Sequence, residues 1–135
     1  GYGIAIDSTI STLSKLRPPF NNTNISLKAA LVALKEKKFV EKTLKNNAEQ
    51  MQIYEKFARE NNIRFIESYT NFIAFFFEKS IDSTALCDYL IKNGIIIRNL
   101  KSYNLNAVRI TIGTEKENKK VLKYIAKFLN KNTEK

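Results

Sequence analysis

Apolar residues recur every three or four positions through the first 60 residues, which is the spacing of amphipathic helices. The pattern predicts a short helix from Asp7 to about residue 16, and a second helix that begins at Asn24 or Ser26. Two prolines, at positions 18 and 19, impose an extended passage between them, because proline cannot donate a helical hydrogen bond. A long third helix is predicted from about Lys38 to Glu60, and its apolar stripe requires a larger body to cover it.

The rest of the chain alternates short β-branched or aromatic runs with two more helical patterns. Strands are predicted at Arg64–Ser68, Asn71–Phe77, Ile95–Arg98 and Val108–Ile112. One helix begins at the N-cap Asp82 and stops at Asn93-Gly94, with Gly94 as a left-handed C-cap. The last helix starts at a capping box, Thr114 to Glu117, and is expected to fray from Lys131. The order predicts an α+β fold, with a mixed or antiparallel sheet that carries helices on one face.

Histidine is absent from the sequence, and there is a single cysteine, Cys87. Catalytic triads built on histidine, zinc sites with histidine ligands and histidine general bases are therefore excluded from this chain. One cysteine cannot build a disulfide framework, which suits a reducing compartment and predicts a cytoplasmic location. With no histidine to activate the thiol, Cys87 is interpreted as a small packed residue of a helix rather than a nucleophile.

The length of 135 residues fits one domain or a large piece of one, and 44% apolar residues suffice for a core. No apolar run is long enough for a membrane span, and the opening Gly1-Tyr2-Gly3 shows no signal-peptide pattern. The net charge of +10 comes mostly from lysines that are spread along helices among glutamates. This distribution resembles solvated helix faces more than a nucleic-acid surface, so neither a nucleic-acid nor a membrane partner is expected; a basic polyanion-binding module remains the alternative.

Two strand arginines, Arg98 and Arg109, are the most informative polar residues. In the run from Val108 to Ile112 the three aliphatic residues share one face, so Arg109 and Thr111 point to the other. Arg98 follows three isoleucines, and both guanidinium groups can converge if their strands are neighbours. A planar guanidinium binds carboxylate or phosphate through two parallel hydrogen bonds. The alternative is that each arginine pairs with a nearby Glu or Asp.

A resemblance to a known family favours arginines that bind a carboxylate or phosphate over arginines that pair with a nearby Glu or Asp. Residues 94–118, GIIIRNLKSYNLNAVRITIGTEKEN, resemble the C-terminal signature of histidinol-phosphate aminotransferases, which belong to the fold-type I enzymes that use pyridoxal phosphate. Other segments match in the same order. These are Gly1–Ala5 after the cofactor motif, Leu16–Asn21 in the interdomain passage, Glu41–Leu44 on the long helix, and Ser68–Ile73 at the family's Asn-Phe strand.

The resemblance implies roles for particular residues. Residues 1–35 would be the end of the large domain with interdomain helices, and residues 36–135 the small C-terminal domain. Arg109 would bind the substrate α-carboxylate, and Arg98 would help to hold the phosphate-bearing end. Asn71 is a weaker candidate for substrate binding, since a strand-starting Asn also satisfies turns. Tyr2 and Tyr103 are interpreted as packing or loop anchors.

The family also implies what this chain does not contain. Its cofactor lysine stands in a Ser-Lys-x-x-x-Leu-x-Gly-x-Arg pattern, which is absent here and is expected upstream of Gly1. The chain alone is therefore expected to bind no pyridoxal phosphate and to be inactive, with no catalytic residue and no metal site. The intact enzyme would be a homodimer that transfers amino groups between small amino and keto acids in histidine biosynthesis, after docking of the missing large domain. A relative that acts on another amino acid or on threonine phosphate remains an alternative.

Overall fold

The computed structural model describes residues 3–133, and these divide into two compact units, with the boundary between residues 39 and 40. The first unit contains α1 (Asp7–Lys15), α2 (Asn24–Ala33) and the first residues of α3 (Lys37–Glu60). Neither α1 nor α2 has a buried residue. The Thr23 side chain caps α2 by accepting a 3.1 Å hydrogen bond from the Ser26 N–H. The helices predicted from the apolar spacing are therefore confirmed, while their apolar faces stay uncovered.

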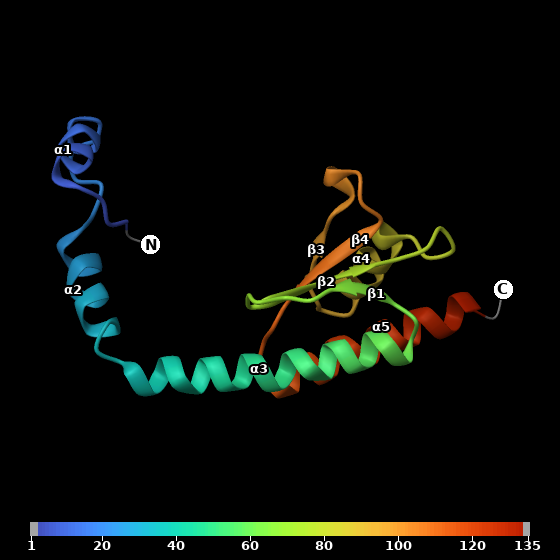
Figure 1. The fold of residues 1–135 in the computed structure, drawn as a ribbon. Helices are drawn as coiled ribbons and strands as arrows, with labels where there is room; N and C mark the ends of the chain where they lie inside the picture. The colour runs from blue at the N-terminus through green and yellow to red at the C-terminus, as the bar shows by residue number, and fades with distance from the viewer. Residues whose placement is uncertain (1–2, 134–135) are drawn as a thin grey trace. The chain divides into compact units, whose positions relative to one another are not determined.

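The second unit is a four-stranded antiparallel sheet with helices packed on it (Figure 1). Its strands lie in the order β1-β2-β4-β3. Their bounds are β1 Arg64–Ile66, β2 Phe72–Phe76, β3 Arg98–Asn99 and β4 Ala107–Thr111, and the helices are α4 (Ser83–Lys92), a 3-10 turn η1 (Lys101–Tyr103) and α5 (Glu115–Thr133). The three strand pairs, β1–β2, β2–β4 and β3–β4, are all antiparallel. Of the mixed and antiparallel sheets that the sequence allowed, the structure has the antiparallel one.

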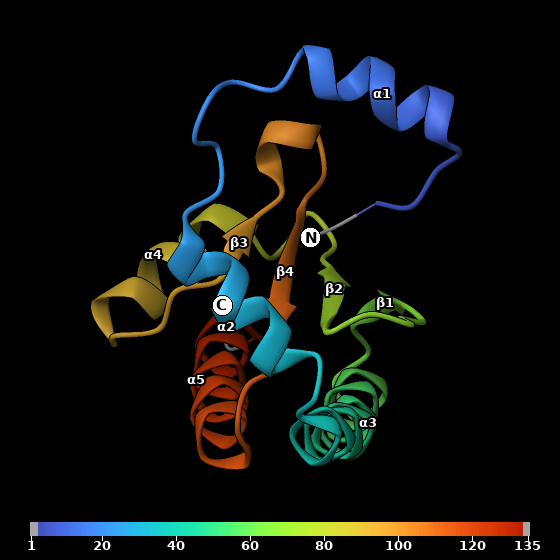
Figure 2. The same cartoon turned by 90° about the vertical axis from the view of Figure 1, so that its left-hand side faces the viewer.

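One face of this sheet forms the core with α3, α4 and α5. Figure 2 views α3 and α5 almost along their axes, on one side of the strands. Ile73 and Phe75 of β2 and Val108 and Ile110 of β4 are at most 1% exposed. They pack in one cluster with helix residues that include Tyr54, Leu86, Leu90, Ile125 and Leu129. This burial accounts for the alternation seen in the sequence, because burying an aliphatic side chain contributes roughly 1.5–3 kcal/mol.

The long helix α3 is covered over only part of its length. Met51, Tyr54 and Ala58 are buried, whereas Val40 and Leu44 near its start are 51% and 63% exposed. The expectation that its stripe needs a larger body therefore holds for the second half within this chain. The first half presents apolar side chains to solvent.

The strand predicted at Ile95–Arg98 is wrong in its bounds, because the three isoleucines precede β3. The Gly94 N–H donates to the Ile91 carbonyl and the Ile95 N–H to the Leu90 carbonyl, both at 2.9 Å. These two bonds form a Schellman motif, with Gly94 left-handed at φ 69° as predicted. Ile95 is 6% exposed and packs in the core, so this segment closes α4 before the strand begins.

The last helix, α5, begins where the sequence predicted. The Thr114 N–H donates to Glu117 Oε2 at 2.8 Å and the Glu117 N–H donates to Thr114 Oγ1 at 3.4 Å, which confirms the capping box. The helix extends to Thr133, and the fraying expected from Lys131 stays a prediction. Leu129 is 7% exposed and anchors the final turns to the core. No helix in residues 3–133 combines the length and the apolar character that a membrane crossing requires.

Candidate functional site

Arg98 and Arg109 are direct partners across the β3–β4 ladder. Arg109 in turn pairs with Ala74 on β2, and Ala74 pairs with Ile66 on β1. One transverse row therefore crosses the sheet through Ile66, Ala74, Arg109 and Arg98. Residues directly opposite in antiparallel strands point to the same face. The row lies on the face opposite the core, so the predicted outward direction of Arg109 and its convergence with Arg98 agree with the structure.

Within the described residues, the guanidinium groups of Arg98 and Arg109 have no acidic partner. Arg98 and Arg109 are exposed, and no Asp or Glu of the described chain lies within 4.0 Å of either side chain in an ion pair. The alternative in which each arginine pairs with a local carboxylate is therefore not found. Like charges directly opposite on two strands destabilise a sheet, and a bound anion would offset this repulsion.

Aromatic rings lie beneath two arginines on the same outer face. The Arg109 Cζ atom is 4.9 Å from the centroid of the Phe72 ring, and the Arg64 Cζ atom is 4.3 Å from that of Phe76. Both phenylalanines belong to β2 and are half-buried. The face thus combines cations with apolar surface, a combination that suits an organic anion better than a free metal ion.

Asn71 lies apart from the arginine row. Its main-chain carbonyl accepts a 2.8 Å hydrogen bond from the Ile112 N–H, which extends the β2–β4 pairing by one step. It shares the alternation of Ile73 rather than that of Ala74. Asn71 lines a separate hollow of about 300 Å³ together with residues of α3, among them Asn46 and Asn47. Its role in substrate binding stays a prediction.

The end of β4 is held by a buried amide that sequence reasoning missed. Asn118 is 2% exposed; its Oδ1 accepts from the Gly113 N–H at 3.0 Å and the Tyr54 hydroxyl at 3.1 Å. Its Nδ2 donates to the Gly113 carbonyl at 3.0 Å and to Gln50 Oε1 at 3.1 Å. The Asn46 side chain of α3 also donates to the Gly113 carbonyl, at 3.0 Å. These bonds fix the strand that carries Arg109 to two helices.

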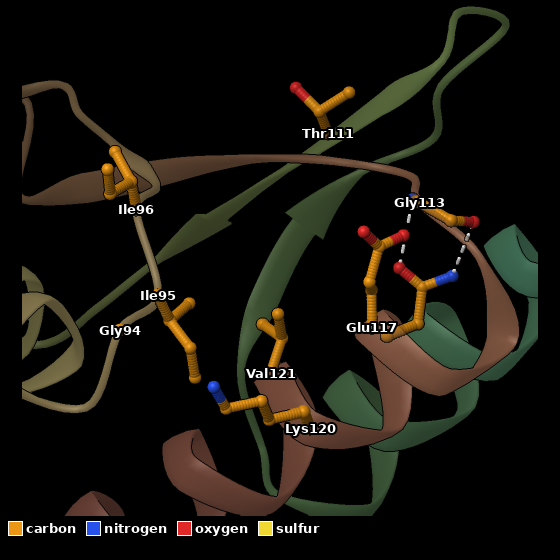
Figure 3. A pocket seen from close by; sticks show the side chains of 9 residues that line it. Gly94, Ile95, Ile96, Thr111, Gly113, Glu117, Lys120 and Val121 are labelled. Carbon is orange, nitrogen blue, oxygen red and sulfur yellow. Dashed lines mark hydrogen bonds between the residues drawn. The ribbon is translucent and has the colours of Figure 1, made fainter.

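A hollow of about 490 Å³ lies beside this amide, between the Gly94–Ile96 segment and the start of α5 (Figure 3). Its polar groups are mostly engaged within the protein. Glu117 accepts hydrogen bonds from Thr114, and Asn118 already makes the four bonds described above. The Thr114 bonds lower the pKa of Glu117, which keeps this carboxylate ionised as a helix cap. Lys120 is the cation at its edge, so the hollow offers fewer free anion-binding groups than the arginine row.

The described lysines do not offer a cofactor site. A lysine that forms an imine is ordinarily desolvated or placed beside another cation, which makes its neutral form accessible. Every lysine whose side chain the structure describes is exposed. These residues therefore do not fit covalent attachment of pyridoxal phosphate, and no step of its chemistry can be assigned to them.

Of the remaining candidates, Cys87 is a packed residue and Tyr103 is exposed. Cys87 is 6% exposed, and burial raises the pKa of its thiol, with further increases from the charges of Asp88 and Asp82. A thiol held in this form is a poor nucleophile. Tyr103 is 62% exposed in η1, and Tyr2 lies outside the described residues. Among the described residues no cluster of three or more His, Cys, Asp or Glu could hold a metal ion.

This chain is similar in sequence to histidinol-phosphate aminotransferases. The chain is 52% identical over 129 residues to a histidinol-phosphate aminotransferase of Campylobacter hominis, and 58% identical over 127 residues to that of Campylobacter lari. These matches cover 96% and 94% of the chain but only 35% of each relative. The chain thus spans about a third of the length of the curated relatives it matches.

Solved structures show the same fold. Histidinol-phosphate aminotransferase from Sinorhizobium meliloti, in complex with pyridoxal-5'-phosphate, matches with a TM-score of 0.80 at 22% identity, over 92% of this chain and 34% of that one. The Clostridium acetobutylicum enzyme matches with a TM-score of 0.78 at 25% identity, over 92% and 38%. The sequence model of the family "Aminotransferase class I and II" matches residues 1–125. The chain therefore belongs to the class I and II aminotransferases.

Proposed function

We propose that this chain is the substrate-binding small domain of a histidinol-phosphate aminotransferase. The intact enzyme would convert histidinol phosphate and 2-oxoglutarate to imidazole acetol phosphate and glutamate, in histidine biosynthesis. The observation that carries the proposal is the cross-strand pair of Arg98 and Arg109, exposed on one sheet face without a carboxylate partner in the described chain. The names of the relatives supply the substrate.

Each arginine has a proposed task. Arg109 would bind the α-carboxylate of glutamate or 2-oxoglutarate, and Arg98 would bind the phosphate-bearing end of histidinol phosphate. Bidentate hydrogen bonds fix the orientation of an anion as well as its position. Orientation matters because the breaking Cα–H bond must stand perpendicular to the cofactor ring. Histidinol phosphate has no carboxylate, so one arginine would change partner between the two half-reactions.

The cofactor would bind elsewhere in the longer protein. Pyridoxal phosphate withdraws electrons from the substrate when bound, and the lysine that carries it would precede residue 1 in the pattern given above. Residues 1–35 would join the large domain to the small domain of residues 36–135. The exposed apolar side chains of α1, α2 and the start of α3 would then be covered by the large domain. We also propose a cytoplasmic homodimer, and no activity for this chain alone.

The test is single-turnover kinetics on the full-length protein that contains this chain, loaded with pyridoxal phosphate. Arg109→Lys should slow the glutamate half-reaction about 10- to 100-fold, because it removes bidentate contacts to a charged group, and should affect histidinol phosphate less. Arg64→Lys is the matched control, since Arg64 lies on the same sheet face outside the Arg98–Arg109 row. Equal losses in both half-reactions would refute the assignment of Arg109.

Substrate identity needs a separate assay. A structure of L-threonine-O-3-phosphate decarboxylase from Porphyromonas gingivalis shares the fold, with a TM-score of 0.74 at 18% identity over 94% of this chain and 40% of that one. We expect histidinol phosphate to be turned over in preference to threonine phosphate, tested by direct competition. Preference for threonine phosphate would contradict the proposed substrate and favour a relative that acts on threonine phosphate.

A further inference from the structure

Phe72 is the side chain that contacts the Arg109 guanidinium on the outer sheet face. Phe72 pairs with Thr111, and Ala74 pairs with Arg109, so Phe72 is the diagonal neighbour of Arg109 across the β2–β4 ladder. Diagonal neighbours lie within reach of long and aromatic side chains. The 4.9 Å distance from the Arg109 Cζ atom to the ring centroid is inside the range of a cation–π contact.

This contact restrains the guanidinium without using its hydrogen-bond donors. A ring attracts a cation through its negative face, whereas a carboxylate would occupy the N–H groups themselves. Since no acidic side chain in the described residues pairs with Arg109, its five N–H donors remain available to a ligand. Arg109 is thus held in place and still able to bind.

Arg98 has no comparable support. The cation–π contacts in the described structure involve Arg59, Arg64, Arg109, Lys127 and Lys131. Arg98 makes none of them, and it lies on β3, the last strand in the sheet order. Among the described residues no strand pairs with β3 on its other side, so Arg98 has no cross-strand neighbour there. The two arginines of the pair therefore differ in how their side chains are restrained.

We propose that Phe72 is a positioning residue that holds Arg109 as the fixed anion clamp, and that Arg98 is the clamp that re-orients between substrates. The inference rests on the proposed function, and it adds which of the two arginines changes partner. A fixed Arg109 loses little side-chain freedom when a carboxylate binds, so the carboxylate gains affinity through pre-organisation. An unrestrained Arg98 can turn from the phosphate of histidinol phosphate to the side-chain carboxylate of glutamate.

Side-chain dynamics test the structural half of this proposal in the 135-residue chain itself. ¹⁵N relaxation of the arginine Nε–Hε groups should give a higher order parameter for Arg109 than for Arg98. Phe72→Leu should lower the Arg109 value to that of Arg98, and Phe72→Tyr should retain it, because tyrosine keeps the ring. Phe76→Leu is the matched control, since it removes a ring of the same strand and face that lies under Arg64 instead. Equal mobility of Arg98 and Arg109 in the unaltered chain would overturn the proposal.

Kinetics of the full-length protein that contains this chain test the functional half. Phe72→Leu should raise the KM for 2-oxoglutarate about two- to fivefold, the range of an exposed cation–π contact, while kcat is unchanged and Phe72→Tyr restores the KM. If Arg109→Lys impairs the glutamate half-reaction but Phe72→Leu leaves the KM unaltered, only the positioning role of Phe72 fails. If Arg109→Lys leaves both half-reactions unaltered, the proposed function itself fails.

Discussion

Asn118 brackets Gly113 from both sides, accepting from its N–H and donating to its carbonyl. Gly113 follows β4, so a single side-chain amide on α5 fixes the exit of the strand that carries Arg109. The same amide reaches Gln50 and Tyr54 on α3. Burial of the Tyr54 hydroxyl raises its pKa well above the ordinary value, so it stays a neutral donor to Asn118.

Replacement of Asn118 by leucine should destabilise the fold strongly. The change removes four hydrogen bonds and leaves the buried groups of Tyr54 and Gln50 without a partner, at about 1–3 kcal/mol for each unsatisfied group. Urea denaturation of the 135-residue chain would measure the free energy of unfolding. Asn130→Leu, at an exposed position of the same helix, is the control and should change it little. Equal effects of the two variants would contradict this account of the network.

Gly113→Ala should weaken the start of α5. A Cβ atom at this position would lie 2.8 Å from Glu117 Oε2, so the carboxylate would have to leave the Thr114 cap. Because the obstacle is the end of a flexible side chain, the expected loss of stability is limited to the hydrogen bonds between Glu117 and Thr114.

A double-mutant cycle with Glu117→Ala separates this cause from a backbone effect. Once the carboxylate is gone, Gly113→Ala should cost less than it does alone, so the two changes should be less than additive in thermal denaturation. Full additivity would show that the clash with Glu117 is not the reason.

Stability should fall in acid partly through Glu117. Hydrogen bonds from the Thr114 side chain and backbone lower its pKa in the folded state. Because the pKa of Glu117 is lower in the folded protein than in the unfolded one, its ionised carboxylate stabilises the fold at any pH above the unfolded pKa of about 4.3. This stabilisation is lost as the pH falls through the folded pKa. Glu117→Gln should therefore flatten the dependence of Tm on pH below about 4.3.

The cause of that pKa shift can be tested directly. Thr114→Ala removes the side-chain hydrogen bond and keeps the backbone one, so the pKa of Glu117 should rise part of the way toward its ordinary value. A ¹³C titration of the Glu117 carboxyl would measure it. An identical titration curve in both proteins would exclude the Thr114 hydroxyl as the cause.

Removal of the charge repulsion between Arg98 and Arg109 should stabilise the isolated chain. Like charges directly opposite in a sheet are unfavourable by about 0.2–1 kcal/mol, so Arg98→Gln should raise the free energy of unfolding by that amount at low salt. The gain should shrink as salt screens the pair. Inorganic phosphate should raise the Tm of the unaltered chain more than that of Arg98→Gln or Arg109→Gln. A loss of stability in Arg98→Gln at low salt would show that the pair is not repulsive.

The sequence predicted which face of the sheet Arg109 lies on, but not which residues of other strands lie beside it. Alternation along one strand is local, so the burial of Val108 and Ile110 and the outward side of Arg109 follow from period two. That Arg98 is its direct partner depends on the register between β3 and β4, which no single segment determines. Phe72 was not recognised for the same reason, since its contact with Arg109 arises from the pairing of β2 with β4.

The wrong bounds of the strand at Ile95–Arg98 and the missed role of Asn118 also have specific causes. Three consecutive isoleucines favour a strand by composition, yet the Schellman closure at Gly94 and the burial of Ile95 leave them in the connection between α4 and β3. Asn118 resembled a solvated residue of a charged helix turn, because a buried amide and an exposed one look alike without knowledge of the facing helix. The capping box and the stop at Gly94 were predictable, because both depend on residues within a few positions.

The cross-strand register of Arg98 and Arg109 has a consequence for how this domain can diversify. Their separation is set by the hydrogen-bonded ladder and not by the connection through η1 and residues 104–106. Insertions in that connection would add little closure entropy and would leave the span between the two charges intact. A slip of one residue in the pairing would instead turn one arginine to the core side. The connection can therefore vary in length, while the ladder keeps the two arginines directly opposite each other.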